Sequence, residues 1–531
     1  MQDLYSIELA RRGYVVLALD LHSHGDSESL SIAELYDGAV GVDGAVQLIA
    51  SLPYVDTARI GVTGHSSGGT AANMAVEIDN SRETPLIAAV LQQAGDWQDD
   101  TGGDHSGDYG SRSVGIIAST HDDFYFGTYN DAGNMLTNPV AFMETDGAKK
   151  FLNFNEDGFA GIAEGGKYYT RDFDGKTAYR VIYRPNMIHP LVAFSTTCVG
   201  YAVDFFDTTL GAPKPLPASD QIWPIKAVFN SLGVIGLLIF MVSFTLVLLD
   251  TPVFSALRSG EIVQPAPVQD SGAKAWYWVL LIIGAVFSGS SFLFCMNTVY
   301  SKTTNFFVQT GPLTIGTWAA LCGIFAIFCS AVFYGAYGKK HGWSARRAGL
   351  YLNLEQLWKT IALAVIVIVV SFGLVFAAHY FFQVDYRMYV VAFKTFGADK
   401  VLIALRYLPF FLLFYVMNSI SANCFNYNTI GGKNGNILIF AFFNALGAIF
   451  VVASQYIYFY ATGYQLYGLT EGQRIGPIWL FPCMVLLFVT PIMSRIIYKR
   501  TRNPYIAGLI NAMFIVMISC SNTTTILAAV S

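Results

Sequence analysis

Cysteine is scarce in this chain, and its scarcity limits the kinds of site that the sequence can contain. The 531 residues include seven cysteines, of which Cys198 alone lies within the first 222 residues, and no two form a C-x-x-C pair. A disulfide framework is therefore not expected. No group of His, Cys and acidic residues has the spacing of metal ligands, so we expect no metal and no organic cofactor.

Charged residues are also few, at 13% of the chain against 53% hydrophobic residues, and they are unevenly divided. Residues 1–222 contain 30 acidic and 13 basic side chains, whereas residues 223–531 contain 7 and 19. The acidic part lacks the clustered Lys and Arg that neutralise phosphates, so nucleic acid is not expected as a partner. The Pro-rich stretch "GAPKPLPASDQIWP" separates the two compositions. We therefore predict a first domain over 1–212, a linker over 213–226 and a second domain over 227–531.

The second domain is rich in apolar runs of about 20 residues, the length that a membrane-spanning helix requires. We predict an all-helical, multi-pass transmembrane bundle of eight spans: 227–249, 275–298, 313–337, 358–382, 407–426, 436–461, 477–497 and 505–524. Lys and Arg in the loops mark the cytoplasmic side of such a bundle. Loops one–two, three–four, five–six and seven–eight hold twelve of them, and the opposite side holds seven. We therefore expect the first domain on the extracytoplasmic side of the membrane.

Few polar side chains lie within the predicted spans. His379 lies near the end of one span, where an interfacial or packing role is simpler than a place in a proton path. The Asn and Ser residues of "NSISANCFNYN", at 418–428, could line a polar cavity, but hydrogen bonds between helices are favoured. These residues do not require that the bundle be a transporter.

The first domain alternates apolar runs with amphipathic stretches, which is typical of an α/β fold with a mostly parallel sheet. The predicted strands are "YVVLALDL" (14–21), "RIGVTGH" (59–65), "LIAAVLQQA" (86–94), "SVGIIAST" (113–120) and "TAYRVIYR" (177–184). Between the last two strands we predict a helix over 138–154 and a hairpin that turns at Asp174-Gly175.

A G-x-S-x-G pattern follows the second predicted strand, as Gly64-His65-Ser66-Ser67-Gly68. With a strand before it and a helix after it, this pattern predicts a sharp turn that exposes the Ser66 hydroxyl as a nucleophile. The turn directs the backbone N–H of Ser67 at a developing oxyanion. Outside this context the same letters would indicate only a Gly-rich turn. His65 more plausibly shapes the turn than acts as a base.

A serine nucleophile needs a base, and the base needs an acid that orients it. Asp122 and Asp123 lie at the end of the fourth predicted strand, and His189 follows the fifth. The order Ser, Asp, His along the chain is that of α/β-hydrolase triads. We therefore predict a triad of Ser66, Asp122 and His189, and keep Asp123 as the alternative acid because it is one residue farther from the strand.

The segments "ELARRGYVVLALDLHSHGDSES", "GVTGHSSGG", "STHDDFYF" and "NMIHPLVAF" resemble the α/β-hydrolase superfamily, especially dienelactone-hydrolase-like and prolyl-oligopeptidase-like esterases. Bacterial membrane proteins that join such a domain to a multi-helix C-terminal region resemble the chain more closely still. The resemblance covers residues 1–210 and implies an α/β-hydrolase fold with Ser66 as nucleophile, Asp122 as acid and His189 as base. It gives Ser67 one oxyanion N–H and implies no cofactor.

The chain departs from this resemblance at its N-terminus. The first residues look like the helix that follows the third strand of the family, so strands one to three and the loop that supplies the second oxyanion donor would be missing. The strand that should separate 14–21 from 59–65 would be among them. We hypothesise that Met1 is an internal methionine of a longer protein. Loss of one oxyanion donor costs about 3–4 kcal/mol of transition-state stabilisation, so activity of this chain alone is in question.

The sequence therefore predicts a membrane-tethered serine hydrolase that cleaves small-molecule or lipid-like carboxylic esters through an acyl-enzyme, in the bacterial plasma membrane and in contact with its lipids. One alternative is a prolyl-oligopeptidase-like peptidase, although no propeller repeat is visible. A second is a non-catalytic receptor or transport component that binds a ligand. Trp97, Phe124, Tyr125 and Phe126 are candidates for an acyl pocket, but packing in the core would explain them equally well.

Overall fold

The computed structural model describes residues 3–99, 103–129 and 135–527, and these residues divide into two compact units. The first unit comprises Met1–Lys226 together with Gln455–Arg474 and Thr525–Ser531. The second comprises Ala227–Ser454 and Ile475–Thr524. Two late segments of the sequence therefore belong to the acidic N-terminal unit, which the composition did not indicate.

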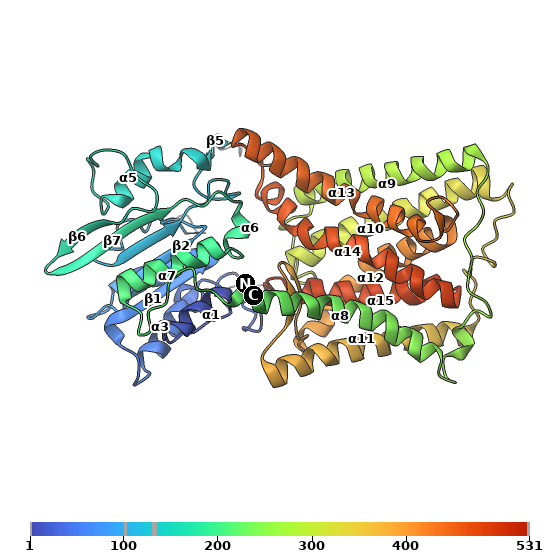
Figure 1. The fold of residues 1–531 in the computed structure, drawn as a ribbon, viewed down its shortest axis with the longest axis horizontal. Coiled ribbons are helices and arrows are strands. Elements are labelled where there is room, and N and C mark those ends of the chain that lie inside the picture. Colours follow the sequence, from blue (N-terminus) through green and yellow to red (C-terminus); the bar gives the residue numbers. More distant parts are fainter. Residues whose placement is uncertain (1–2, 100–102, 130–134, 528–531) are drawn as a thin grey trace. The chain divides into compact units, whose positions relative to one another are not determined.

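The first unit is built on a mixed, mostly parallel sheet (Figure 1). Its elements are α1 (Asp3–Arg11), α2 (Asp37–Val40), α3 (Val42–Ala50), η1 (Thr57–Arg59), β1 (Ile60–His65), α4 (Ser67–Asn80), β2 (Ile87–Gln93), β3 (Ser113–Ile117), β4 (Thr128–Tyr129), β5 (Met135–Thr137), η2 (Pro139–Glu144), α5 (Asp146–Leu152), β6 (Tyr169–Phe173), β7 (Lys176–Tyr183), α6 (His189–Val192) and α7 (Thr196–Leu210). The five-stranded sheet has the order β1-β2-β3-β7-β6, in which only β6 is antiparallel to its neighbour.

Helices cover the two faces of this sheet because successive side chains of a strand point to opposite sides. Ile60 and Val62 of β1 pack in one apolar cluster with Val76 of α4. Gly61, between them, faces Phe206 of α7, whose ring leaves no room for a larger residue there. The carboxyl ends of β1, β2, β3 and β7 consequently meet along one edge between two helical layers.

Four of the five predicted strands are confirmed, and so is the hairpin at Asp174-Gly175, where both residues have positive φ as a type I′ turn requires. The helix predicted over 138–154 is instead a 3₁₀ turn followed by α5, because Thr145 is extended and caps α5 with its hydroxyl.

The prediction of a strand over 14–21 is wrong. This segment is not a strand, and no strand pairing joins it to another part of the described chain. The nearest strand in sequence, β1, lies at the edge of the sheet and pairs only with β2. A β-branched and apolar run becomes a strand only when another strand accepts its hydrogen bonds. Val15, Leu17 and Leu19, which alternate along the run, are 46%, 41% and 38% exposed.

Simultaneous substitution of Val15, Leu17 and Leu19 by threonine should reduce binding of a hydrophobic dye and slow aggregation without lowering the melting temperature. Their side chains are too exposed to contribute much burial free energy, whereas an exposed apolar edge promotes association. The control is Val62→Thr in β1, which places a hydroxyl in the core and should cost about 1–3 kcal/mol. Equal destabilisation by the triple and control substitutions would contradict this account of the segment.

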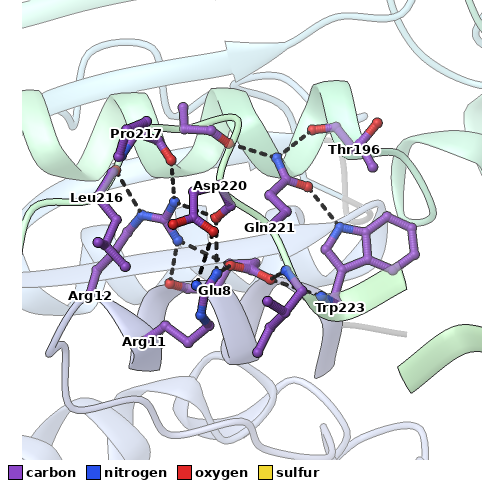
Figure 2. Close-up of polar contacts among 11 residues, drawn as sticks. Glu8, Arg11, Arg12, Thr196, Leu216, Pro217, Asp220, Gln221 and Trp223 are labelled. Carbon is purple, nitrogen blue, oxygen red and sulfur yellow. Dashed lines mark hydrogen bonds and ion pairs between the residues drawn. The ribbon is translucent and has the colours of Figure 1, made fainter. Parts of the chain in front are cut away.

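A buried ion pair holds the linker on α1 (Figure 2). Arg12, one of the largest fully buried side chains, binds the Glu8 carboxylate at 3.1 Å and donates to the carbonyls of Leu216, Pro217 and Asp220. The other Glu8 oxygen accepts the backbone N–H groups of Ile222 and Trp223 at 2.7 and 2.9 Å. Trp223 is the first residue of α8, so Glu8 satisfies an N-terminal donor of that helix.

The remaining elements are mainly long helices: α8 (Trp223–Leu249), η3 (Ser255–Leu257), α9 (Ser271–Thr298), α10 (Thr310–Phe333), η4 (Tyr334–Gly338), α11 (Leu354–Phe382), β8 (Tyr386–Met388), β9 (Val391–Phe393), α12 (Asp399–Ile420), η5 (Ser421–Phe425), α13 (Gly432–Thr462), α14 (Glu471–Thr501) and α15 (Pro504–Ser521). Within the described residues, eight helices are long and apolar enough to cross a membrane, as expected of a multi-pass membrane protein. In the second unit α15 packs against α11 and α12, and α10 packs against α9 and α12.

The polar run at 418–428 makes hydrogen bonds between helices of the second unit. Asn418 of α12 donates to Asn444 of α13 at 2.6 Å, and Ser419 bonds Ser494 of α14 at 2.6 Å. Where the run continues, α12 widens into the π-turn η5. His379 is half-buried in the last turn of α11. Interhelical hydrogen bonding, the interpretation favoured for the Asn and Ser residues, is therefore confirmed for Asn418 and Ser419.

Candidate active site

Ser66 occupies a strained turn between β1 and α4. Its φ of 57° and ψ of −124° lie outside the regions that non-glycine residues ordinarily adopt. The turn closes so tightly that a Cβ on Gly64 would lie 2.2 Å from the backbone of Gly68. The Ser66 N–H donates to the Gln93 carbonyl at 2.9 Å, which holds the turn against β2. Such strain persists only where surrounding structure enforces it, and it is common at functional sites.

Ser67 begins α4 and is exposed. No backbone carbonyl of the described chain accepts its N–H, because the first N–H groups of a helix have no partner within the helix. The N-terminus of α4 also carries the positive end of the helix dipole. An oxyanion formed next to Ser66 would therefore meet at least one donor with favourable electrostatics.

Asp122 lies beyond the carboxyl end of β3 and is completely buried. Its carboxylate accepts the backbone N–H groups of Phe124 and Tyr125, each at 3.0 Å, and the hydroxyl of Ser119 at 2.9 Å. Burial by itself raises the pKa of Asp122, but the charge and hydrogen bond of His189, with the two backbone donors, leave the pKa below its usual value. Asp122 is consequently an anion with a fixed orientation.

His189 follows β7 at the start of α6 and is also buried. Its Nδ1 lies 2.9 and 3.0 Å from the two carboxylate oxygens of Asp122, so Nδ1 carries the proton and Nε2 is left to accept one. Burial lowers the pKa of His189, while the Asp122 charge and hydrogen bond raise it, and the net shift is upward. This arrangement is that of a base oriented by an acid.

The structure brings His189 to the serine turn through the neighbouring residue His65. The two imidazole rings lie 4.7 Å apart, and the His65 Nε2–H donates to the His189 carbonyl at 3.1 Å. Burial, followed by the charge on His189, lowers the pKa of His65 to about 3, so His65 is neutral and serves as a spacer. No hydrogen bond between the Ser66 hydroxyl and His189 occurs among the described residues. Such bonds often form only when substrate is bound.

Asp123, the alternative acid, makes a different set of interactions. The carboxylate that lies at hydrogen-bond distance from the His189 imidazole is that of Asp122 rather than that of Asp123. Burial, together with repulsion from Asp122, raises the pKa of Asp123 to about 8. Asp123 is therefore largely protonated at neutral pH, whereas Asp122 is ionised and bound to the ring. The geometry favours Asp122 over Asp123 as the residue that orients the histidine.

The four aromatic candidates for an acyl pocket separate into two pairs. Trp97 stacks on Phe142, and Phe126 packs on the same ring, so both belong to the apolar core. Phe124 and Tyr125 instead lie beside His189, with ring centroids 5.0 and 5.9 Å from its imidazole. Phe124 and Tyr125 are thus the two candidates that lie next to the histidine, and Tyr125 also packs against the apolar core.

Sequence reasoning missed the contribution of residues 455–474 to this unit. Gln465 donates through Nε2 to the Asp123 carbonyl at 2.6 Å. The rings of Phe459 and Tyr460 lie 5.4 and 4.3 Å from that of His121, the residue before Asp122. The end of α13 and the residues after it thus support the loop that carries the acid. No local pattern marks such a long-range contact.

No protein-family model, no curated protein and no solved structure matches this chain. Its function must therefore be inferred from the geometry of the site.

Proposed function

We propose that the first unit is a serine hydrolase of the α/β-hydrolase type that cleaves carboxylic esters. The observation that carries the proposal is the buried Asp122–His189 pair, which lies against the strained turn of Ser66 through His65. The three residues follow β1, β3 and β7, whose carboxyl ends share one edge of the sheet. This is the order of nucleophile, acid and base that the α/β-hydrolase resemblance implies.

The proposed mechanism assigns one role to each group. The Ser66 hydroxyl attacks the ester carbonyl while His189 Nε2 takes its proton, and Asp122 holds the imidazole in the required tautomer. The Ser67 N–H stabilises the oxyanion of the tetrahedral intermediate. His189 then protonates the leaving alcohol, and a water molecule, activated by the same histidine, releases the acid from Ser66. Phe124 and Tyr125 provide an apolar wall for the substrate, which suits a lipid-like or small aromatic ester.

We infer that this unit lies on the extracytoplasmic side of the membrane, because the opposite loops of the helical part carry the excess of Lys and Arg. In sealed membrane vesicles with their outer face exposed, added protease should cleave the linker at 213–222 in the Arg12→Leu variant, whose linker has lost the buried ion pair that holds it on α1. Protection of the linker in intact vesicles, with cleavage only after lysis, would place the first unit on the cytoplasmic side instead.

Fluorophosphonate labelling of the full-length protein tests the hydrolase proposal directly. An activated serine should form a covalent phosphonyl adduct, and mass spectrometry should place the adduct on the peptide that contains Ser66. Failure to label, or labelling on another serine, would favour the alternative of a hydrolase-like unit that binds a ligand without cleaving it. The missing hydrogen bond between Ser66 and His189 is the one observation that favours this alternative.

Asparagine substitutions should distinguish the two aspartates. Asp122→Asn should lower the rate of ester hydrolysis on the order of 10⁴-fold, because the amide no longer holds the required tautomer of His189. Asp123→Asn should leave most of the activity at pH 7, because a neutral amide replaces a carboxyl group that is already largely protonated. The measurement is the rate of p-nitrophenyl ester hydrolysis by each variant. A larger loss of hydrolysis rate with Asp123→Asn than with Asp122→Asn would mean that Asp123, and not Asp122, orients His189.

The pH profile of the wild-type protein provides a further readout of the same pair. His189 must be unprotonated to act as a base, so the rate should rise with pH through a midpoint above 6.5, in the direction of its raised pKa. Asp122→Asn removes the charge that raises this pKa and should move the midpoint of the residual activity to lower pH.

A further inference from the structure

The helical unit contains a buried arginine that has no acidic partner. Arg495 lies near the end of α14 and is 1% exposed. Its guanidinium donates to the side-chain oxygens of Asn423 and Asn436 at 2.8 and 3.0 Å and to the carbonyl of Ala422. All three acceptors are neutral, and no ion pair of Arg495 with Asp or Glu occurs in the described part of the chain. A buried charge without a counter-ion is costly.

Two lysines add to this positive charge. Lys499 lies one turn beyond Arg495 on α14, and Lys433 lies in the first turn of α13. Lys499 is repelled by the charges of both Arg495 and Lys433. Arg495 and Lys499 also lie over the same ring, that of Tyr427, at 3.9 and 6.0 Å from its centroid. None of the three cations forms an ion pair among the residues that the structure describes. We call Arg495, Lys499 and Lys433 the cationic cluster.

The N-terminus of α13 lies at this cluster, because Asn436 in its first turns accepts a bond from Arg495. Gly431 and Gly432 precede Lys433 with φ of 77° and 75°, and the first turn contains no acidic residue. A lysine at a helix N-terminus is unfavourable in the field of the helix dipole, whereas an anion there is favourable and accepts the unpaired N–H groups. One bound anion therefore lowers the electrostatic free energy of the three cations and of the N-terminus of α13 together.

We propose that the cationic cluster and the N-terminus of α13 bind a phosphate group. Lys433, Lys499 and the first N–H groups of α13 contact the phosphate oxygens. Arg495 is a positioning residue, which holds the first turns of α13 through Asn436 and adds its charge next to the Tyr427 ring. Two compact ammonium groups and a helix N-terminus match a tetrahedral anion better than a single carboxylate. The phosphate is carried by an anionic phospholipid or is free in solution, and this site is independent of the proposed hydrolase activity.

The test uses the full-length chain in lipid nanodiscs at about 0.15 M salt, where surface charges are screened beyond about 8 Å. One arm compares thermal stability and co-purified lipid between pure phosphatidylcholine and a mixture with phosphatidylglycerol. The other arm adds inorganic phosphate to protein in pure phosphatidylcholine. Each lysine that contacts a phosphate near the membrane surface contributes about fivefold in affinity, so Lys433→Gln with Lys499→Gln should weaken binding about 25-fold. These lysines are at least partly exposed, so the variant keeps its fold.

The matched control is Lys339→Gln with Lys340→Gln, which removes the same charge from exposed positions that follow α10. The control pair should change binding by about twofold or less, because Lys339 and Lys340 lie in a different loop and are not part of the cationic cluster. Stabilisation by phosphatidylglycerol alone identifies a lipid headgroup, and stabilisation by inorganic phosphate identifies a free anion. Absence of both effects, or an equal loss in the control pair, would overturn the proposal.

Discussion

Replacing Ser66 with alanine is expected to lower the rate of ester hydrolysis by about 10⁴-fold or more and to abolish fluorophosphonate labelling. The hydroxyl is the only group of the proposed mechanism that forms a bond to the substrate, so no neighbour replaces it. The residual rate would come from the oxyanion donor and from substrate binding alone. The measurement is the steady-state rate with p-nitrophenyl esters of increasing chain length, on the full-length protein in detergent.

Ser67→Ala is the matched control for this experiment. It deletes a hydroxyl one residue away, on the exposed side of the same turn, but retains the backbone N–H that the mechanism assigns to the oxyanion. The activity of this variant should therefore remain close to that of the wild-type protein. Comparable losses of activity from both substitutions would indicate that hydrolysis depends on the conformation of the turn rather than on the Ser66 hydroxyl. Such a result would remove the main support for a nucleophile at this position.

The positions of the site residues were predictable because each one follows a strand that its own side chains specify. The apolar runs that become β1, β2, β3 and β7 have the strand pattern, and each lies beside another strand of the sheet. Residues directly after parallel strands then share an edge. The sequence order of Ser66, Asp122 and His189 was therefore sufficient to place them on one edge. It could not give the spacer role of His65, which depends on the distance between two loops.

The failed strand at 14–21 has a physical cause that periodicity cannot reveal. Strand propensity reports how well a side chain fits a pleated, half-buried surface, and a strand also needs a neighbour with free N–H and C=O groups. β1 is the edge strand of the sheet, but the run at 14–21 does not pair with it or with any other strand of the described chain, so no strand accepts its hydrogen bonds. The run therefore keeps the alternation of a strand but not its hydrogen bonds.

Hydropathy identified the eight spans because a helix in lipid must satisfy its backbone internally and present apolar side chains. Because hydropathy is averaged over a whole span, the same criterion does not single out one charged residue such as Arg495. Arg495 lies within the predicted span 477–497, and a charged residue inside a span is itself a signal of function. The three amide and carbonyl oxygens that surround it come from η5 and α13, which only tertiary packing brings together.

Replacing Arg12 with leucine should produce the largest loss of stability in the first unit, about 3–5 kcal/mol. The substitution leaves the Glu8 carboxylate buried without its buried cationic partner and deprives the carbonyls of Leu216, Pro217 and Asp220 of a shared donor. The linker should then detach from α1 before the sheet unfolds. Limited proteolysis at 213–222 measures that detachment, and thermal unfolding of the full-length protein measures the loss of stability.

Arg11→Leu is the control, because Arg11 also binds Glu8 and Asp220 but from a side chain that is 24% exposed, where an ion pair is worth about 1 kcal/mol or less. Similar cleavage rates for the two variants would contradict the role of the buried pair.

The pH dependence of linker cleavage gives an independent check. Burial raises the pKa of Glu8, but hydrogen bonds from Trp223, Arg11, Ile222 and Arg12 leave it below the usual value. The stabilisation by Glu8 is therefore complete above its unfolded pKa and is lost as the pH falls through the lower folded pKa. The wild-type linker should become sensitive to protease only in acid, whereas in Arg12→Leu it should already be sensitive at pH 7.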